Sequence, residues 1–179
     1  NLHVYILCRG HDWLFNLLQG TSYVTCAVLA GAIAGRLSCG RSLRFLAALL
    51  YMSMPIACAE ALTTQVDNFA AVWLLFFVYR LLDYVDVKKA MCFDKATVWR
   101  VGTMGLCVAW WYLTKPSVCV GMVIFALWLL IVCFRRKDRL RDLAGIFFCA
   151  LPCVAVPLAP EILRNFKSFG AYASPAAGA

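Results

Sequence analysis

The chain has 179 residues, of which 64% are hydrophobic and 15% charged, with a mean hydropathy of +0.79. Soluble domains are about 45–50% apolar and about 25% charged, so these values exclude a soluble globular domain and a disordered tail. The net charge of +8 comes from basic residues between apolar runs, which is where membrane topology places them. The composition therefore predicts a multi-pass membrane protein with no nucleic-acid partner.

The first part of the chain, residues 1–19, is mixed in character. Trp13 and Phe15 stand beside Arg9 and Asp12, so we expect an interfacial segment or the end of an earlier helix. The chain opens without an initiator Met or a signal peptide, and we expect it to be an internal fragment of a longer protein.

Six apolar stretches follow and predict an all-α, polytopic transmembrane helical bundle of about six membrane helices, within one membrane-embedded domain, residues 1–179. Several stretches are shorter than the ~20 residues that a straight span needs, so flanking residues must snorkel or some helices must stop partway. We expect residues 161–179 to start a loop on the outer face. The stretches are Thr21–Gly35, Phe45–Ala61, Asn68–Leu82, Val101–Thr114, Pro116–Phe134 and Leu143–Pro160.

The fourth and fifth stretches are separated by a single charge, Lys115, followed by Pro116. One helix over Val101–Phe134 would run ~51 Å, far beyond a ~30 Å hydrocarbon layer. Since proline disfavours helix in the residue before it, a hairpin that turns at Thr114–Ser117 fits better. With this turn, thirteen Lys and Arg residues fall on one face and four on the other, which agrees with the positive-inside rule.

This topology places a sparse set of polar residues on the non-cytoplasmic face. Glu60, Gln65 and Asp67 crowd the outer ends of two helices. A charge near hydrocarbon is costly unless it is paired or faces water, so Asp67 is a candidate for binding a cation or a hydroxylated substrate. The alternative is that Asp67 lies in the first turn of a helix and interacts favourably with the helix dipole.

Two further cationic positions fall on the same predicted face. The ammonium group of Lys115 would bind a phosphate as a point charge. The alternative is that the Lys115 side chain extends to the membrane interface and only anchors the hairpin there. Arg164 and Lys167 are three residues apart and would share a helical face near the membrane surface. They would clamp a diphosphate or a phosphosugar, or serve as interfacial anchors.

These residues occur in an order that resembles the membrane core of bacterial type-C glycosyltransferases, the polytopic enzymes related to protein mannosyltransferases and aminoarabinose transferases. The resemblance covers nearly the whole chain, and its most specific pieces are Thr-Gln-x-Asp and Arg-Asn-x₃-Phe-Gly. The matching segments are Asp12–Gln19, Pro55, Thr64–Asp67, Thr114–Pro116 and Pro160–Gly170.

The resemblance implies transfer of a sugar from a polyprenyl-phosphate carrier to a protein, lipid or glycan acceptor at the outer face of the bacterial plasma membrane. It implies that Asp67 is a catalytic acidic position that orients the donor or helps to hold a divalent cation, Mg²⁺ or Mn²⁺. Gln65 and Glu60 would bind substrate, and Lys115 and Arg164 would bind the donor phosphate. Nothing in the chain matches the family's first outer loop with its catalytic acid pair, so we expect the fragment alone to be inactive.

Two other classes of protein are alternatives to a glycosyltransferase. A transporter would show broken helices in an inverted repeat with polar residues at mid-bilayer, and we find no repeat and a polar set gathered at one rim. A non-enzymatic membrane subunit would use the polar rim to bind a partner and would tolerate Ala at Asp67 and Lys115.

Overall fold

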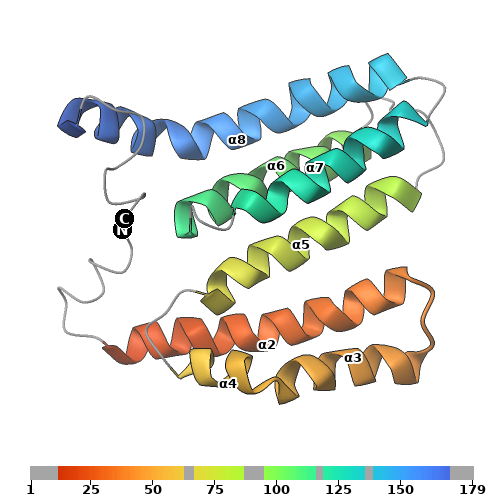
Figure 1. Ribbon diagram of the computed structural model, residues 1–179, viewed down its shortest axis with the longest axis vertical. Helices are drawn as coiled ribbons and strands as arrows, with labels where there is room; N and C mark the ends of the chain where they lie inside the picture. The colour runs from red at the N-terminus through yellow and green to blue at the C-terminus, as the bar shows by residue number, and fades with distance from the viewer. Residues whose placement is uncertain (1–11, 63–66, 87–94, 116–118, 136–138, 170–179) are drawn as a thin grey trace. The chain divides into compact units, whose positions relative to one another are not determined.

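The computed structural model describes residues 12–62, 67–86, 95–115, 119–135 and 139–169, and throughout these residues the regular structure is helical (Figure 1). This confirms the predicted all-α class. The chain divides into two compact units, residues 1–79 and 80–179, which are described separately. The helices are α2 (Asp12–Arg36), α3 (Arg41–Ser53), α4 (Pro55–Ala61), α5 (Asp67–Asp86), α6 (Lys95–Thr114), α7 (Cys119–Phe134) and α8 (Arg139–Phe169).

Three of the described helices are long and apolar enough to cross a membrane, over Asn16–Arg36, Asp67–Val85 and Leu143–Lys167. The pair formed by α3 and α4 passes the same test together but is bent by 64°, so the number of candidate spans rises to four if the pair is one broken span. α7 contributes a shorter apolar segment, and α6 carries Arg100 in its second turn. A total of about six membrane-crossing helices therefore stays a prediction.

The helix boundaries differ from the predicted ones at both ends of the chain. α2 begins at Asp12, inside the predicted interfacial segment, whose residues 1–11 lie outside the described part. α8 continues through Pro160 to Phe169, so residues 161–169 are helical where the sequence predicted the start of a loop. An ion pair between Glu161 and Arg164, three residues apart, supports the helix there.

In the first unit, α2 and α3 form a close pair joined by a short turn (Figure 1). Ser38 has a left-handed backbone (φ 63°) and ends α2, with its N–H donating to the carbonyl of Gly35. The chain then returns as α3, whose backbone approaches Gly31 so closely that an added Cβ would lie 3.0 Å from the Arg44 carbonyl oxygen. Small residues on α2 therefore let the two helices touch.

A corner separates α3 from α4. Pro55 is the first residue of α4, and Met54 before it is extended (φ −67°, ψ 115°). Proline lacks the N–H of the helical ladder and disfavours helix in the preceding residue, which explains why one apolar stretch forms two helices. The predicted stretch Phe45–Ala61 is thus a bent pair of helices.

In the second unit, α6 packs chiefly against α8 and more lightly against α7. The helix predicted to break at Thr114–Ser117 does end at Thr114, Lys115 is non-helical, and α7 begins at Cys119. α7 packs back on α6, because Gly121 lies against the ring of the buried Trp111. These contacts support the hairpin; Pro116 and Ser117 lie outside the described residues.

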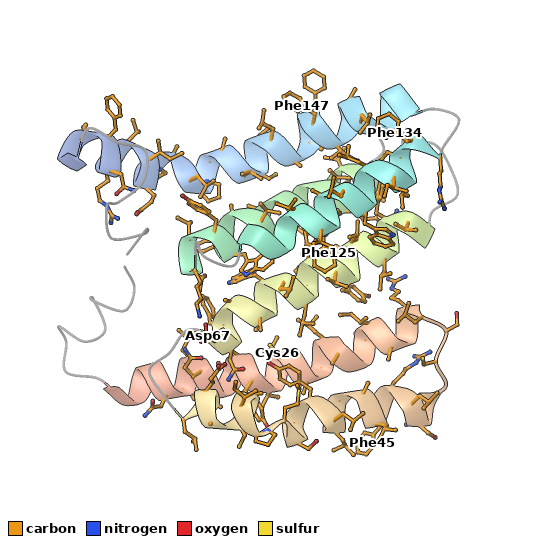
Figure 2. The ribbon with its side chains drawn as sticks, viewed as in Figure 1. Cys26, Phe45, Asp67, Phe125, Phe134 and Phe147 are labelled. Atoms are coloured by element: carbon orange, nitrogen blue, oxygen red, sulfur yellow. The ribbon has the colours of Figure 1, made fainter. Side chains whose placement is uncertain are left out.

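Large apolar side chains cover the outward faces of both units. None of the residues of α3 is buried, and its Phe45 is 66% exposed. In α7 and α8 the exposed side chains include Ile124, Phe134 and Phe147, the last two labelled in Figure 2 together with Phe45. Faces of this kind suit contact with lipid and are unusual on soluble proteins.

Candidate functional site

The predicted acidic residues lie at helix ends of the first unit. Asp67 is the first residue of α5, where a carboxylate interacts favourably with the helix dipole, and Figure 2 shows it at that end. Glu60 is the second-last residue of α4. Both side chains are half-buried. Gln65, the third predicted residue, lies outside the described part of the chain.

A buried polar cluster that the sequence analysis did not identify adjoins these carboxylates. At its centre is Asn68, whose side chain is 1% exposed. Its Oδ1 accepts a hydrogen bond from the Tyr51 hydroxyl (3.2 Å), and its Nδ2 donates to the Ala57 carbonyl oxygen (2.9 Å). The Cys26 thiol donates to the main-chain oxygen of Asn68 (3.5 Å). One residue of α5 thus contacts α2, α3 and α4; we call these four residues the Asn68 cluster.

Lys115 directly follows the last residue of α6. Its N–H continues the helical ladder to the Trp111 carbonyl oxygen (3.0 Å), and its side chain is half-buried. Trp111 is 2% exposed, so the end of α6 is fixed by a large buried ring one turn before the lysine. The ammonium group is therefore carried on a well-packed helix end.

Arg164 lies near the end of α8 and forms an ion pair with Glu161. Its side chain is 51% exposed, and Lys167 in the last turn is also exposed. The carboxylate of Glu161 offsets part of the positive charge that a donor phosphate would meet at this helix end. Arg164 and Lys167, three residues apart on one helix, still present two cations to one face.

The predicted common site has members in both units: Glu60 and Asp67 belong to the first unit, and Lys115 and Arg164 belong to the second. Within the first unit, Asn68 joins the start of α5 to α4, the helix that carries Glu60. A single cavity shared by Asp67, Lys115 and Arg164 stays a prediction.

The second unit holds a further ionic group that sequence reasoning assigned to topology alone. Asp83 of α5 is buried, and its Oδ2 accepts a hydrogen bond from the Arg100 Nε of α6 (3.0 Å). The guanidinium of Arg80 lies 3.8 Å from the same oxygen. The bond from Arg100 to Asp83 joins α5 to α6 at the predicted cytoplasmic side, so these charges also serve packing.

The described residues contain no group of three or more His, Cys, Asp or Glu side chains that would hold a metal ion. A divalent cation at Asp67 stays a prediction.

Comparisons of the chain with protein-family models, with curated proteins and with solved structures find no match.

Proposed function

We propose that the chain is the membrane part of a glycosyltransferase that moves a sugar from a polyprenyl-phosphate donor to an acceptor at the outer face of the bacterial plasma membrane. The observation that carries the proposal is the position of the charged residues at helix ends. Asp67 begins α5, Lys115 follows α6, and Arg164 is one turn from the end of α8. If successive helices from α5 to α8 alternate in direction, these three ends belong to one side of the membrane.

The reaction is a direct displacement at the anomeric carbon. The acceptor oxygen forms a bond to that carbon, the bond from carbon to the phosphate oxygen breaks, and polyprenyl phosphate leaves with the electron pair. A carboxylate takes the acceptor proton, because the attacking oxygen becomes acidic as the new bond forms. The leaving phosphate gains negative charge, so fixed cations beside it lower the barrier.

Each site residue has a distinct part in this reaction. Asp67 accepts hydrogen bonds from the sugar hydroxyls and orients the donor, with Glu60 and Gln65 contacting substrate beside it. Lys115 binds the donor phosphate as a compact point charge. Arg164 binds the same phosphate through its planar guanidinium, in competition with its ion pair to Glu161. A donor taken from the bilayer needs no nucleotide-binding loop, and the sequence has no Gly-rich phosphate loop.

The test measures transfer of radiolabelled sugar from polyprenyl-phosphate donors in membranes that contain the full-length protein. The variants are Asp67→Asn and Lys115→Ala at matched expression. The matched controls are Asp86→Asn, at the other end of the same helix, and Lys95→Ala, an exposed lysine that begins α6. We expect transfer to fall at least about 100-fold in the two variants, since fixed charges at a reacting centre contribute about 10²–10³ in rate. Both controls should retain wild-type rates.

Transfer that survives both variants would move the site elsewhere, and the absence of transfer from every donor tested would overturn the proposal. The second candidate is a transporter, which the bent pair α3–α4 favours because discontinuous helices are typical of transporter binding sites. Uptake of a free sugar or sugar phosphate into proteoliposomes, without any transfer product, would select that class.

A further inference from the structure

We infer that Asn68 is a positioning residue: it holds the corner between α3 and α4 in a fixed shape within the membrane and thereby sets where Asp67 and Glu60 lie. The inference rests on the proposed function for its effect on catalysis, but its structural part is independent of it.

Contacts along α2 and α5 show that these helices run side by side in the same direction within the first unit. Cys26 contacts Asn68, and further along Arg36 donates to the Tyr79 hydroxyl (3.1 Å). Ten residues of α2 and eleven of α5 separate the two contacts, which at 1.5 Å per residue is about 15 Å. These contacts place Cys26 and Asn68 about 15 Å from the level of Arg36, inside the candidate membrane spans of α2 and α5.

A helix break at this depth is costly because lipid offers no hydrogen bonds to the freed backbone groups. The carbonyls near the corner are instead satisfied one by one. The Tyr51 carbonyl accepts from the Met54 N–H (3.2 Å), the Leu50 carbonyl accepts from Ser53 Oγ (2.9 Å), and the Met52 carbonyl accepts from the Tyr23 hydroxyl of α2. The corner is thus completed by side chains, one of which comes from another helix.

Asn68 provides a hydrogen-bond partner on the α4 side of the corner and also joins α4 to α3. Its Nδ2 donates a hydrogen bond to the Ala57 carbonyl oxygen of α4, and its Oδ1 accepts a hydrogen bond from the Tyr51 hydroxyl of α3. A primary amide offers a donor and an acceptor on one rigid plane, so this side chain bonds to both sides of the bend at once. A large change in the bend angle would stretch or break these two bonds.

The same bonds locate the two carboxylates of the candidate site. Asp67 is the residue before Asn68, and Glu60 follows Ala57 by one helical turn, so the bond from Asn68 to Ala57 links the two helix ends that carry them. The corner is therefore a fixed part of the site and does not act as a hinge.

The test uses the protein's own cysteines as probes, in the full-length protein in native membranes. Cys26 and Cys133 are both 0% exposed, the first in contact with Asn68 and the second in the other unit. The rate of alkylation by N-ethylmaleimide is measured at each by mass spectrometry. Local opening of the corner raises the rate at Cys26 alone, whereas general unfolding raises both rates.

We expect Asn68→Ala to raise the Cys26 rate about 30-fold, since it removes two hydrogen bonds. The matched control is Asn165→Ala, which changes another buried asparagine, in α8, and should leave Cys26 unchanged. A Cys26 rate within twofold of wild type in Asn68→Ala, or an equal rise at Cys133, overturns the inference.

A parallel transfer assay separates this inference from the proposed function. If the wild type transfers sugar, Asn68→Ala should lower kcat at least tenfold and change the donor KM by a smaller factor, because Asn68 positions the carboxylates that orient the sugar while Lys115 and Arg164 bind the donor phosphate. An unchanged kcat overturns the positioning role. If the wild type transfers nothing, the proposed function fails, and the alkylation rates still decide whether Asn68 fixes the corner.

Discussion

Replacing Gly105 by Ala should push α6 away from α8 and destabilise the second unit. A Cβ built at Gly105 would lie 2.6 Å from the Ala150 carbonyl oxygen, and 3.1 and 3.2 Å from the Cα and carbonyl carbon of Ala150. All three are backbone atoms, so no side chain can rotate away. Ordinary contact begins at 3.4 Å, and the two helices must therefore separate by about 0.8 Å at this point.

The expected cost follows from two opposing terms. Overpacking of a well-packed contact costs about 1–3 kcal/mol, and a clash with backbone belongs near the upper end. Alanine is the better helix former by about 1 kcal/mol, which offsets part of this cost. The net change in the free energy of unfolding for Gly105→Ala is a loss of about 1–2 kcal/mol.

The matched control is Gly20→Ala in α2, where an added Cβ meets nothing within 4 Å. This variant should gain up to about 1 kcal/mol from helix propensity alone. Both are measured by titrating the folded protein in mixed micelles with sodium dodecyl sulfate and following helicity by circular dichroism. Equal stabilities for Gly105→Ala and Gly20→Ala would refute the close packing of α6 on α8.

Three further outcomes are expected. Asp83→Asn removes a buried carboxylate shared by two arginines, so the same titration should show a loss of about 2 kcal/mol, and an unchanged midpoint would contradict the packing role of this ion pair. Glu161→Gln leaves Arg164 more available to a phosphate, so the donor KM in the transfer assay should fall about two- to fivefold at low salt; a rise would count against Arg164 as a phosphate ligand. With a membrane-impermeant maleimide, Lys115→Cys should react in right-side-out vesicles and Lys95→Cys in inverted ones, and reaction of both from one side would disprove the topology.

The helices were predictable because their signals are local. Runs of apolar residues ended by charges gave the six stretches, and the turn after Thr114 followed from chain length, one lysine and the next proline. Pro55 was visible in the same way, but the bend that it makes was not predicted. The bend is completed by Asn68, whose bonds reach 11 residues back to Ala57 and 17 back to Tyr51. Such pairings depend on how helices meet in space.

The same limit applies to the charged residues. Sequence position showed that Arg100 lies near the predicted cytoplasmic side, but not that it bonds to Asp83 on another helix. It also placed Arg164 and Lys167 on one face without showing that Glu161 competes for the arginine. The four site residues that the structure describes lie at or near the ends of helices, and Gln65 falls outside the described residues. A cavity shared by these residues depends on how the helices pack against one another, which sequence position alone does not show.

The packing of α6 against α8 has a consequence for biosynthesis. The partner of Gly105 is Ala150, about 45 residues later in the chain, and α7 is made between them. At about 5–20 residues per second, the ribosome needs about 2–9 s to deliver α8 after α6. During that interval the Gly105 position of α6 has no α8 backbone to pack against, although Arg100 can already pair with Asp83 of α5. The second unit therefore completes its packing only after the last described helix has been made.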